Sequence, residues 1–366
     1  MSQDIQVPLV KVSMPSREVL MPQLESVLYS GMIAEGEHVY KFESEFERIF
    51  SLKNPLATSS GTGALHIALL LSGVKPGDQV ITTSMTAEPT NTSILQVGAH
   101  PIFADVDPLS GNIDPESARR LISEKTKAIV VVHYAGYPVK IDQFRALADE
   151  FGLSLIEDCA HALGAKYGNR PIGSVGDFSI FSFQAIKHMT TIDGGMLIVK
   201  DSAKVDEAKR LRWFGLSKGV ARTEVDIKVP GYKYNMNNVQ GIIGQMQILE
   251  IENKISAHVQ NGLFFDHELK KINGLEPAQF ERGDLPSYWL YTLLSDEVDN
   301  VIERLASVGV AASKLHRPNH LHTVFEPYRR PLPNLDIFYR RLVHIPCGWW
   351  LRPQDRELIL HVLSRG

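Results

Sequence analysis

The sequence predicts an α/β fold, in which a large domain with a mainly parallel sheet between helices is followed by a smaller C-terminal α+β domain. Two observations lead to this prediction. Short apolar runs alternate with segments of helical spacing along the first half of the chain, and the composition changes beyond an amphipathic stretch near residue 250. Parallel strands need long crossover connections, commonly helices, so such alternation is typical of a sheet covered on both faces.

The expected strands are runs rich in Val, Ile and Phe, which favour extended structure. They read DQVITT from Asp78, HPIFADVD from His100, KAIVVVH from Lys127, LSLIEDCA from Leu153, FSIFSF from Phe178 and GMLIVK from Gly195. The segments between them have helical spacing. Sheets of this kind bind ligands beyond the carboxyl ends of their strands, so we expect a functional site there.

The domain boundary is expected close to a helix that we predict from Asn235 to about Ala257. Its apolar stripe consists of Met236, Val239, Ile243, Met246 and Leu249. Beyond this helix the chain has isolated charges and turns marked by proline. Because 366 residues exceed the usual size of one domain, we predict a large domain over residues 1–250 and a small one over residues 251–366.

Composition limits the classes of partner. The formal net charge is −4 and no block of Lys and Arg occurs, which argues against nucleic acid and acidic membrane surfaces and favours a small molecule. The two cysteines, Cys159 and Cys347, have no spacing typical of a zinc site, so no metal is expected. The N-terminal residues lack a signal-peptide pattern and no run of about 18 apolar residues occurs, so we expect a cytoplasmic protein.

The first candidate site is the segment ATSSGTGALHIALLLSG, from Ala57. It places hydroxyls and a permissive glycine, Ser59 to Thr62, immediately before an apolar helical run. The free N–H groups and the positive dipole at a helix N-terminus favour an anion, so this turn is a candidate phosphate site. The alternative is that the same residues only cap the helix.

The second candidate site is the segment LIEDCAHALGA, from Leu155. Glu157 and Asp158 stand where an apolar strand ends, so at least one carboxylate is expected to point into the region above the sheet. A buried carboxylate needs a charged or strongly hydrogen-bonding partner. A protonated ring nitrogen and a nearby Arg or Lys fit this requirement equally well.

The third candidate site is the segment FSFQAIKHMTTIDGG, from Phe181, in which Lys187 follows an expected strand end. A lysine that reacts as an amine must lose its proton near neutral pH, through burial or a nearby positive charge. The alternative is a lysine that only screens carboxylates. Together, an anion cradle, an acidic strand end and a lysine match what pyridoxal 5′-phosphate (PLP) requires of a protein.

In this order, the motifs SSGTGALH, EDCAHALGA, GDFSIFSFQAIKHMTTIDGG and GYKYNMNNVQ resemble the DegT/DnrJ/EryC1/StrS sugar aminotransferases, a group of fold-type I PLP enzymes. The segment SGMIAEGEHVYKFESEF, from Ser30, is also similar to the N-terminal segment of that family. The resemblance covers most of the chain and is strongest from Ser30 to about Gln247. It implies the fold-type I architecture and a homodimer with shared active sites.

The resemblance implies that Lys187 is the catalytic residue, both as the Schiff-base lysine and as the base that moves a proton between substrate and cofactor. It implies that Asp158 pairs with the pyridine nitrogen and that His161 contacts the ring hydroxyl. The other implied cofactor contacts are Gly61, Thr62, Ser182, Gln184, Lys233 and Asn235, the last two in a segment that in relatives reaches the neighbouring subunit's site.

The implied reaction is a transamination in two halves. An amino acid, usually L-glutamate in this family, gives its amino group to the cofactor, which becomes pyridoxamine 5′-phosphate. A keto sugar, normally carried on a nucleoside diphosphate, then accepts the amino group, as in the biosynthesis of amino sugars for glycans. The candidate substrate contacts are Ser30, Gly31, His188, His316 and Arg317, although the segment from Lys314 that holds the last two fits a solvated edge as well.

Two positions depart from the family pattern. Ala87 stands where many relatives have an aromatic side chain that stacks on the cofactor ring, and Ile192 where relatives often have glycine. Keto-sugar dehydratases of the same fold have histidine in place of the lysine, so a register shifted by one would give His188 that role. Counting from Ser182 favours Lys187 and an aminotransferase. A non-catalytic family member is the other alternative, but such a protein has no physical need for the lysine, the aspartate and the phosphate turn together.

Overall fold

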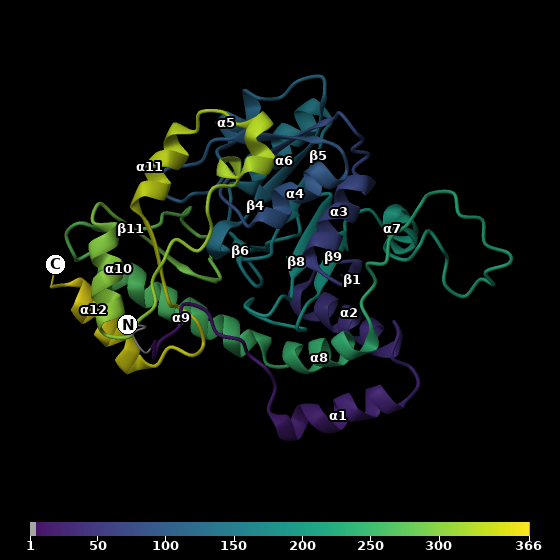
Figure 1. Cartoon of the computed structure of the whole chain (residues 1–366), viewed down its shortest axis with the longest axis horizontal. Helices are drawn as coiled ribbons and strands as arrows, with labels where there is room; N and C mark the ends of the chain where they lie inside the picture. The colour runs from purple at the N-terminus through teal and green to yellow at the C-terminus, as the bar shows by residue number, and fades with distance from the viewer. Residues whose placement is uncertain (1–4, 366) are drawn as a thin grey trace.

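The computed structural model describes residues 5–365 and contains a seven-stranded sheet, a three-stranded sheet and a short hairpin (Figure 1). The strands of the large sheet are β1 (Pro55–Thr58), β2 (Gln79–Thr83), β3 (His100–Ala104), β4 (Thr126–Val132), β5 (Ser154–Asp158), β8 (Phe178–Ser182) and β9 (Gly195–Val199). Their order is β1-β9-β8-β5-β4-β2-β3, and β9 runs opposite to the other six. The α/β prediction is confirmed, and all six predicted runs form strands; the sequence pattern does not predict the four-residue β1.

Helices cover both faces of this sheet. The residues of each strand alternate between the two faces, so Val80 and Val130 join one apolar core while Ile81 and Ile129 join the other. The first core is covered by α3 (Gly61–Leu71), α4 (Glu88–Gln96) and α7 (Val205–Arg212). The second face is covered by α2 (Glu37–Phe50), α5 (Pro115–Arg119) and α6 (Ile141–Phe151).

The helix predicted from Asn235 to about Ala257 is in fact two helices, α8 (Asn238–Ile248) and α9 (Ile251–Leu269). The predicted start was wrong because the Asn237 side chain caps α8 by accepting from the amide of Gln240. The predicted continuity was wrong because Glu250 has a ψ of 0°, which interrupts the helix. Leu249, assigned to the apolar stripe, is therefore exposed, whereas Ile251 is buried.

The C-terminal part contains the antiparallel sheet β10-β11-β12. Its elements are β10 (Leu275–Pro277), β11 (Tyr291–Ser295), α10 (Val298–Ser307), α11 (Pro333–Arg341), β12 (Leu342–Ile345) and α12 (Pro353–Leu363). Val7 and Leu9 of the N-terminal segment pack into its core. The predicted division after residue 250 stays a prediction, and its terminal residues 1–4 and 366 lie outside the described residues.

The remaining elements lie at the periphery or in connections. They are α1 (Arg17–Tyr29), which packs on α8, the hairpin β6 (Lys166–Tyr167) and β7 (Arg170–Pro171), and the short helices η1 (Tyr134–Gly136), η2 (Ser202–Lys204), η3 (Asn319–Leu321) and η4 (Thr323–Tyr328). The segment between α7 and α8 projects from the body at the right of Figure 1. Over residues 5–365, no helix combines the length and the apolar character needed to cross a membrane.

Candidate active site

A cavity of about 380 Å³ lies at the carboxyl ends of the parallel strands. The last residues of β4, β5 and β8 reach it, α3 and α4 begin at its edge, and Trp289 from the C-terminal part closes it. This is the end of the sheet where the sequence predicts the site. The predicted site residues that line this cavity are Gly61, Thr62, Asp158, His161, Ser182, Gln184, Lys187 and His316.

The turn before α3 is a candidate anion cradle. Amides in the first turn of a helix have no partner within the helix, and the positive end of the helix dipole adds to their attraction for an anion. The capping interpretation holds for Ser60, whose Oγ accepts from the amide of Gly63 (3.0 Å), and Ser60 also lines the cavity. A Cβ on Gly61 would lie only 3.1 Å from that of Ser182, so glycine allows the turn and the end of β8 to approach closely.

Asp158, the last residue of β5, directs its carboxylate into the cavity and is 2% exposed. One oxygen accepts from the hydroxyl of Thr90 (2.7 Å), and the other accepts from the amide of Ala160 (3.0 Å). Burial raises the pKa of Asp158, and these two hydrogen bonds and the charge of Lys187 oppose that rise. The carboxylate can therefore still accept a further N–H donor in the cavity.

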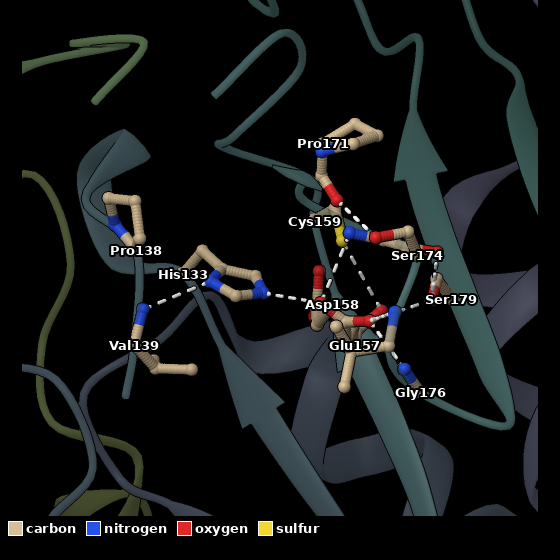
Figure 2. A network of polar contacts seen from close by, with 12 residues as sticks. His133, Pro138, Val139, Glu157, Asp158, Cys159, Pro171, Ser174, Gly176 and Ser179 are labelled. Carbon is tan, nitrogen blue, oxygen red and sulfur yellow. Dashed lines mark hydrogen bonds and ion pairs between the residues drawn. The ribbon is translucent and has the colours of Figure 1, made fainter. Parts of the chain in front are cut away.

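Glu157 points to the opposite side of the strand, into a buried polar network (Figure 2). Its carboxylate accepts from the amides of Gly173, Val175 and Gly176 at 2.6 to 3.1 Å, and its Oε2 lies 3.1 Å from Nε2 of His133. Burial alone would raise the pKa of Glu157, but His133 and the amides outweigh burial and leave the pKa below its usual value. Glu157 is thus a structural residue, unlike its neighbour Asp158.

The same network contains a cluster of possible metal ligands. His133, Glu157 and Cys159 present ligand atoms within 4.8 Å of one another. Burial, with the nearby carboxylates, raises the pKa of Cys159 well above its usual value, so its thiol is protonated. Because the amides already occupy the carboxylate and thiolate is the form that binds metal, hydrogen bonding accounts for this cluster.

Lys187 extends into the cavity from the loop after β8. Burial lowers the pKa of its amine to about 7, although the charge of Asp158 acts in the opposite direction. Nζ lies 3.9 Å from the centroid of the Trp289 ring. An amine with this pKa exists in both protonation states near neutral pH, as a nucleophile or a general base requires.

Two histidines and a tryptophan stack beside Lys187. The rings of His161 and Trp289 are 4.0 Å apart and inclined by 19°, and those of His161 and His316 are 5.5 Å apart and nearly parallel. Burial, with the nearby charge of Lys187, lowers the pKa of His161 well below its usual value and that of His316 to about 4. Both rings are therefore neutral at pH 7 and can donate and accept hydrogen bonds.

Two predicted cofactor residues lie outside this cavity. Nζ of Lys233 donates to Oδ1 of Asn235 (2.9 Å), and both line a separate cavity of about 360 Å³ together with Trp213 and Lys218. That second cavity includes part of the projecting segment between α7 and α8.

Four predicted substrate residues also lie outside the cavity lining. Ser30 and Gly31 are exposed after α1, where Oγ of Ser30 donates to the carbonyl oxygen of Val27 (2.7 Å). Arg317 is exposed next to His316. His188 is buried, and its Nε2 lies 3.0 Å from the carbonyl oxygen of Ser287.

Both departures from the family pattern have a structural setting. Ala87 lines the cavity at the N-terminus of α4, so this wall has only a methyl group at that position. Ile192 has a φ of 77° and is 58% exposed. This left-handed conformation strains a β-branched side chain, which gives a physical reason for the glycine of relatives at this position.

The sequence analysis did not single out Thr90, Trp289 or Asn319. Trp289 lies in the apolar run SYWLYTL, where a tryptophan is typical of a core. The side-chain amide of Asn319 donates to the carbonyl oxygen of Thr86 (2.8 Å) and its oxygen accepts from Asn91 (2.8 Å), which joins the C-terminal loop to the cavity wall. No local pattern marks these residues, because each acts on a partner far away in sequence.

The residues of the cavity fit PLP. The cradle before α3 and the hydroxyl of Ser182 suit its phosphate, Asp158 suits a protonated ring nitrogen, and Lys187 has the pKa of a reactive amine. The fold and this site together define a PLP-dependent enzyme of fold type I.

The chain belongs to the DegT/DnrJ/EryC1/StrS aminotransferase family, whose model matches residues 16–364. It is similar to the spore coat polysaccharide biosynthesis protein SpsC of Bacillus subtilis, with 31% identity over 88% of each chain. The crystal structure of the sugar aminotransferase CalS13 from Micromonospora echinospora is similar with a TM-score of 0.95 and 33% identity, over 99% of this chain and 100% of that chain. Helicobacter pylori PseC, an aminotransferase of pseudoaminic acid biosynthesis, has a TM-score of 0.89 and 26% identity over 98% of each chain. The protein is thus a PLP-dependent sugar aminotransferase.

Proposed function

We propose that this enzyme transfers an amino group from L-glutamate to a keto sugar carried on a nucleoside diphosphate, in the biosynthesis of amino sugars for glycans. The observation that carries the transamination is the presence of Lys187 and Asp158 in one cavity with an anion cradle. The names of two similar proteins, from spore coat polysaccharide and pseudoaminic acid biosynthesis, support a glycan precursor as the product. A cytoplasmic location is part of the proposal, and fractionation of the source cells checks it.

The cavity residues have distinct proposed roles toward the cofactor. When bound, PLP supplies an electrophilic aldehyde and an electron-withdrawing ring. Gly61 and Thr62 bind the phosphate with their amides, and Ser182 adds a hydroxyl. Asp158 holds the proton on the ring nitrogen, and Thr90 fixes the orientation of that carboxylate through its 2.7 Å hydrogen bond. His161 lines the same cavity as a neutral donor for the ring hydroxyl.

Lys187 has two proposed roles at one atom. Its Nζ would first form the covalent bond that retains the cofactor, with the aldehyde oxygen lost as water, and this step requires the neutral amine. After release, the same Nζ would accept a proton from the substrate carbon and deliver it to the cofactor, which requires both protonation states. A pKa of about 7 makes both states available near neutral pH.

His188 is the residue that a dehydratase would use in place of this lysine. Its ring lies against the carbonyl oxygen of Ser287 and does not line the cavity, whereas Lys187 does. This geometry favours the aminotransferase over the dehydratase alternative.

Charge balance supports a homodimer with shared sites. Among the described residues that line the cavity, Lys187 is the only lysine or arginine, although a phosphate and the two carboxylates of glutamate need cations. We propose that Lys233 of a second copy supplies one of them. Large apolar side chains are exposed in two segments that such a copy could cover. The first holds Leu28 and Tyr29 at the end of α1 with Met32 and Ile33 just after it, and the second, between α7 and α8, holds Phe214, Val220, Ile227 and Val229.

The first experiment tests the covalent role of Lys187. The protein is loaded with PLP and reduced with borohydride, and peptide mass spectrometry locates the attached cofactor, which we expect on Lys187. Lys254, whose pKa burial also lowers, serves as an internal control because it lies outside the cavity. Attachment to another lysine, or no loss of attachment in Lys187→Ala, would contradict the assignment.

The second experiment tests the amino donor and acceptor. The PLP-loaded protein is mixed with single amino acids, and conversion to pyridoxamine 5′-phosphate is followed by absorbance. The pyridoxamine-loaded protein is then mixed with nucleotide-linked and free keto sugars. Conversion with L-glutamate and reversal by a nucleotide-linked sugar are expected. No conversion with any donor, despite bound cofactor, would favour a non-catalytic family member.

The third experiment tests the shared site by complementation. Lys187→Met and Lys233→Ala are each expected to be nearly inactive, and their subunits are mixed by unfolding and refolding together. Half of the dimers then contain one subunit of each variant. In such a dimer one of the two sites has both lysines, so about a quarter of the wild-type activity should return. Activity that stays at the level of the separate variants would contradict shared sites, and an active Lys233→Ala would remove Lys233 from the proposal.

A further inference from the structure

The residues on either side of Lys187 are bound to one short segment of the C-terminal part, Ile186 through its main chain and His188 through its side chain. Nε1–H of Trp289 donates to the carbonyl oxygen of Ile186 (2.9 Å), and Nε2 of His188 lies 3.0 Å from the carbonyl oxygen of Ser287. Because a carbonyl only accepts, His188 has its proton on Nε2 and donates it. These two hydrogen bonds run in opposite directions, and we call Ile186, His188, Ser287 and Trp289 the lysine clamp.

The donors of the lysine clamp are buried and uncharged. His188 and Trp289 are each 2% exposed. Burial lowers the pKa of His188 well below its usual value, and the neighbouring His258 acts in the same direction, so the His188 ring is neutral at pH 7. His258 adds a third bond of the same kind, between its Nδ1 and the carbonyl oxygen of Tyr288 (2.9 Å). Hydrogen bonds shielded from water in this way strongly restrict the groups that they join.

The segment that carries Ser287 and Trp289 is itself fixed to the large sheet. The amide of Ser287 donates to the carbonyl oxygen of Gly136, in η1 just after β4 (3.0 Å). A Cβ on Gly136 would lie 2.9 Å from the backbone nitrogens of Tyr288 and Trp289, so only glycine allows this approach. The lysine clamp therefore joins the Lys187 loop both to the large sheet and, through the adjacent β11, to the C-terminal sheet.

The lysine clamp also places an aromatic ring against the amine. Nζ of Lys187 lies 3.9 Å from the centroid of the Trp289 ring, which also stacks with His161. The indole excludes water from the side of Nζ that it covers. Since burial is the largest cause of the lowered pKa of Lys187, a loop that is released from the lysine clamp and moves Nζ away from this ring into water should let the amine regain its proton.

We propose that His188 and Trp289 are positioning residues that hold Lys187 in its half-buried, cavity-facing place by fixing the residues on both sides of it, Ile186 by its carbonyl oxygen and His188 by its side chain. A lysine side chain is long and flexible, so main-chain movement would add to the movement of Nζ. Misplacement of a reacting atom by about 1 Å costs orders of magnitude in rate. The catalytic consequence rests on the proposed role of Lys187, whereas the lysine clamp itself is a property of the protein without cofactor.

The test measures the amine in the cofactor-free, full-length protein. Acetic anhydride labels the neutral amine at a series of pH values from 6 to 9.5, and peptide mass spectrometry gives the rate at Lys187. The wild-type profile should have its midpoint near pH 7, the pKa that burial gives this amine. In His188→Leu and Trp289→Phe the midpoint should rise by one unit or more, which lowers the neutral fraction at pH 7 about fivefold. The midpoint is compared because a looser site also changes access to the amine.

The other titratable groups near Lys187 do not produce this change. Burial lowers the pKa of His161 and His188 well below the usual value, and that of His316 to about 4, so these rings stay neutral over the range measured. Asp158, whose pKa burial raises, is present in every variant.

Two control variants separate positioning from a general loss of stability. His188→Gln keeps a side-chain N–H for the carbonyl oxygen of Ser287 and should restore the wild-type midpoint. Trp350→Phe removes an indole donor of the same kind, which binds the carbonyl oxygen of Pro8 (3.0 Å) away from the cavity, and should leave the midpoint unchanged. Circular dichroism and urea unfolding establish that each variant folds. If His188→Leu does not fold, Trp289→Phe and His188→Gln decide the question.

An unchanged midpoint in the folded His188→Leu and Trp289→Phe variants would overturn the proposal, whatever their loss of stability. An equal shift in Trp350→Phe would also overturn it. In the loaded enzyme, the same two variants should lose kcat while the KM for the amino donor changes little. If PLP does not attach to Lys187, the proposed function fails, but the labelling profile still decides whether the lysine clamp controls this amine.

Discussion

Replacing Lys187 by methionine should remove a pH dependence from the stability of the cofactor-free protein. Methionine keeps a long apolar side chain and has no titratable amine. Burial lowers the pKa of Lys187 to about 7, whereas lysine in an unfolded chain has a pKa of about 10.4. Between these values the unfolded state binds one more proton than the folded state, so the lysine costs stability at pH 7 and the cost is relieved as pH rises.

The size of this effect follows from the one-proton difference. A full proton changes the free energy of unfolding by about 1.4 kcal/mol per pH unit, or by about 2 kcal/mol between pH 8 and pH 9.5. Urea unfolding of wild type and Lys187→Met at equal protein concentration gives the free energy of unfolding at each pH. The advantage of the methionine variant should shrink by this amount across the interval, and taking the difference removes the titration of groups common to both proteins.

A constant difference between the two proteins would refute this reasoning. It would mean that Lys187 remains protonated in the folded state at neutral pH, and so that the cavity does not desolvate Nζ. The amine could then act neither as a nucleophile nor as a base without a further change in the site. The proposed mechanism would lose its main physical support.

Three further changes test the surroundings of the cavity. Thr90→Val removes the hydroxyl that donates to Asp158, so the pKa of Asp158 should rise further. As the pH is lowered, the affinity for PLP, measured by fluorescence, should therefore begin to fall at a higher pH in the variant than in the wild type. An identical dependence of affinity on pH in the two proteins would contradict this. Gly195→Ala places a Cβ 2.6 Å from the amide nitrogen of Gly61, so the cradle must move and PLP affinity should drop by about tenfold or more, which titration calorimetry measures. Glu157→Gln replaces an accepting carboxylate oxygen by an N–H₂ group that faces the N–H donors of the buried network. The free energy of unfolding, measured by urea unfolding, should fall by about 3 kcal/mol. A loss below about 1 kcal/mol would show that the network is dispensable.

The sequence predicts the central fold well because its signals are local. Each parallel strand is a short run of β-branched and aromatic residues, and the period of such runs differs from that of the helices between them. The four-residue β1 has too little pattern to be recognised, and the break between α8 and α9 depends on the backbone at Glu250, which an unbroken apolar periodicity conceals.

The placement of Glu157 and Asp158 shows how far the pattern reaches. The sequence expects at least one carboxylate above the sheet, and the strand period of two implies that neighbours point to opposite faces. Only the surrounding structure decides which one is free. The amides of the segment 173–176 bind Glu157, while Asp158 enters the cavity next to Thr90.

The sequence by itself determined the α/β class, the Ser-Gly-Thr turn before α3, and the presence of a carboxylate and a lysine at neighbouring strand ends, because each depends on residues close together in the chain. The tertiary structure decided which groups surround Nζ of Lys187. Trp289 reaches Ile186 and Ser287 reaches His188 only because the segment before β11 packs against the Lys187 loop. Burial by such distant residues sets the pKa of the amine, and no local pattern contains that information.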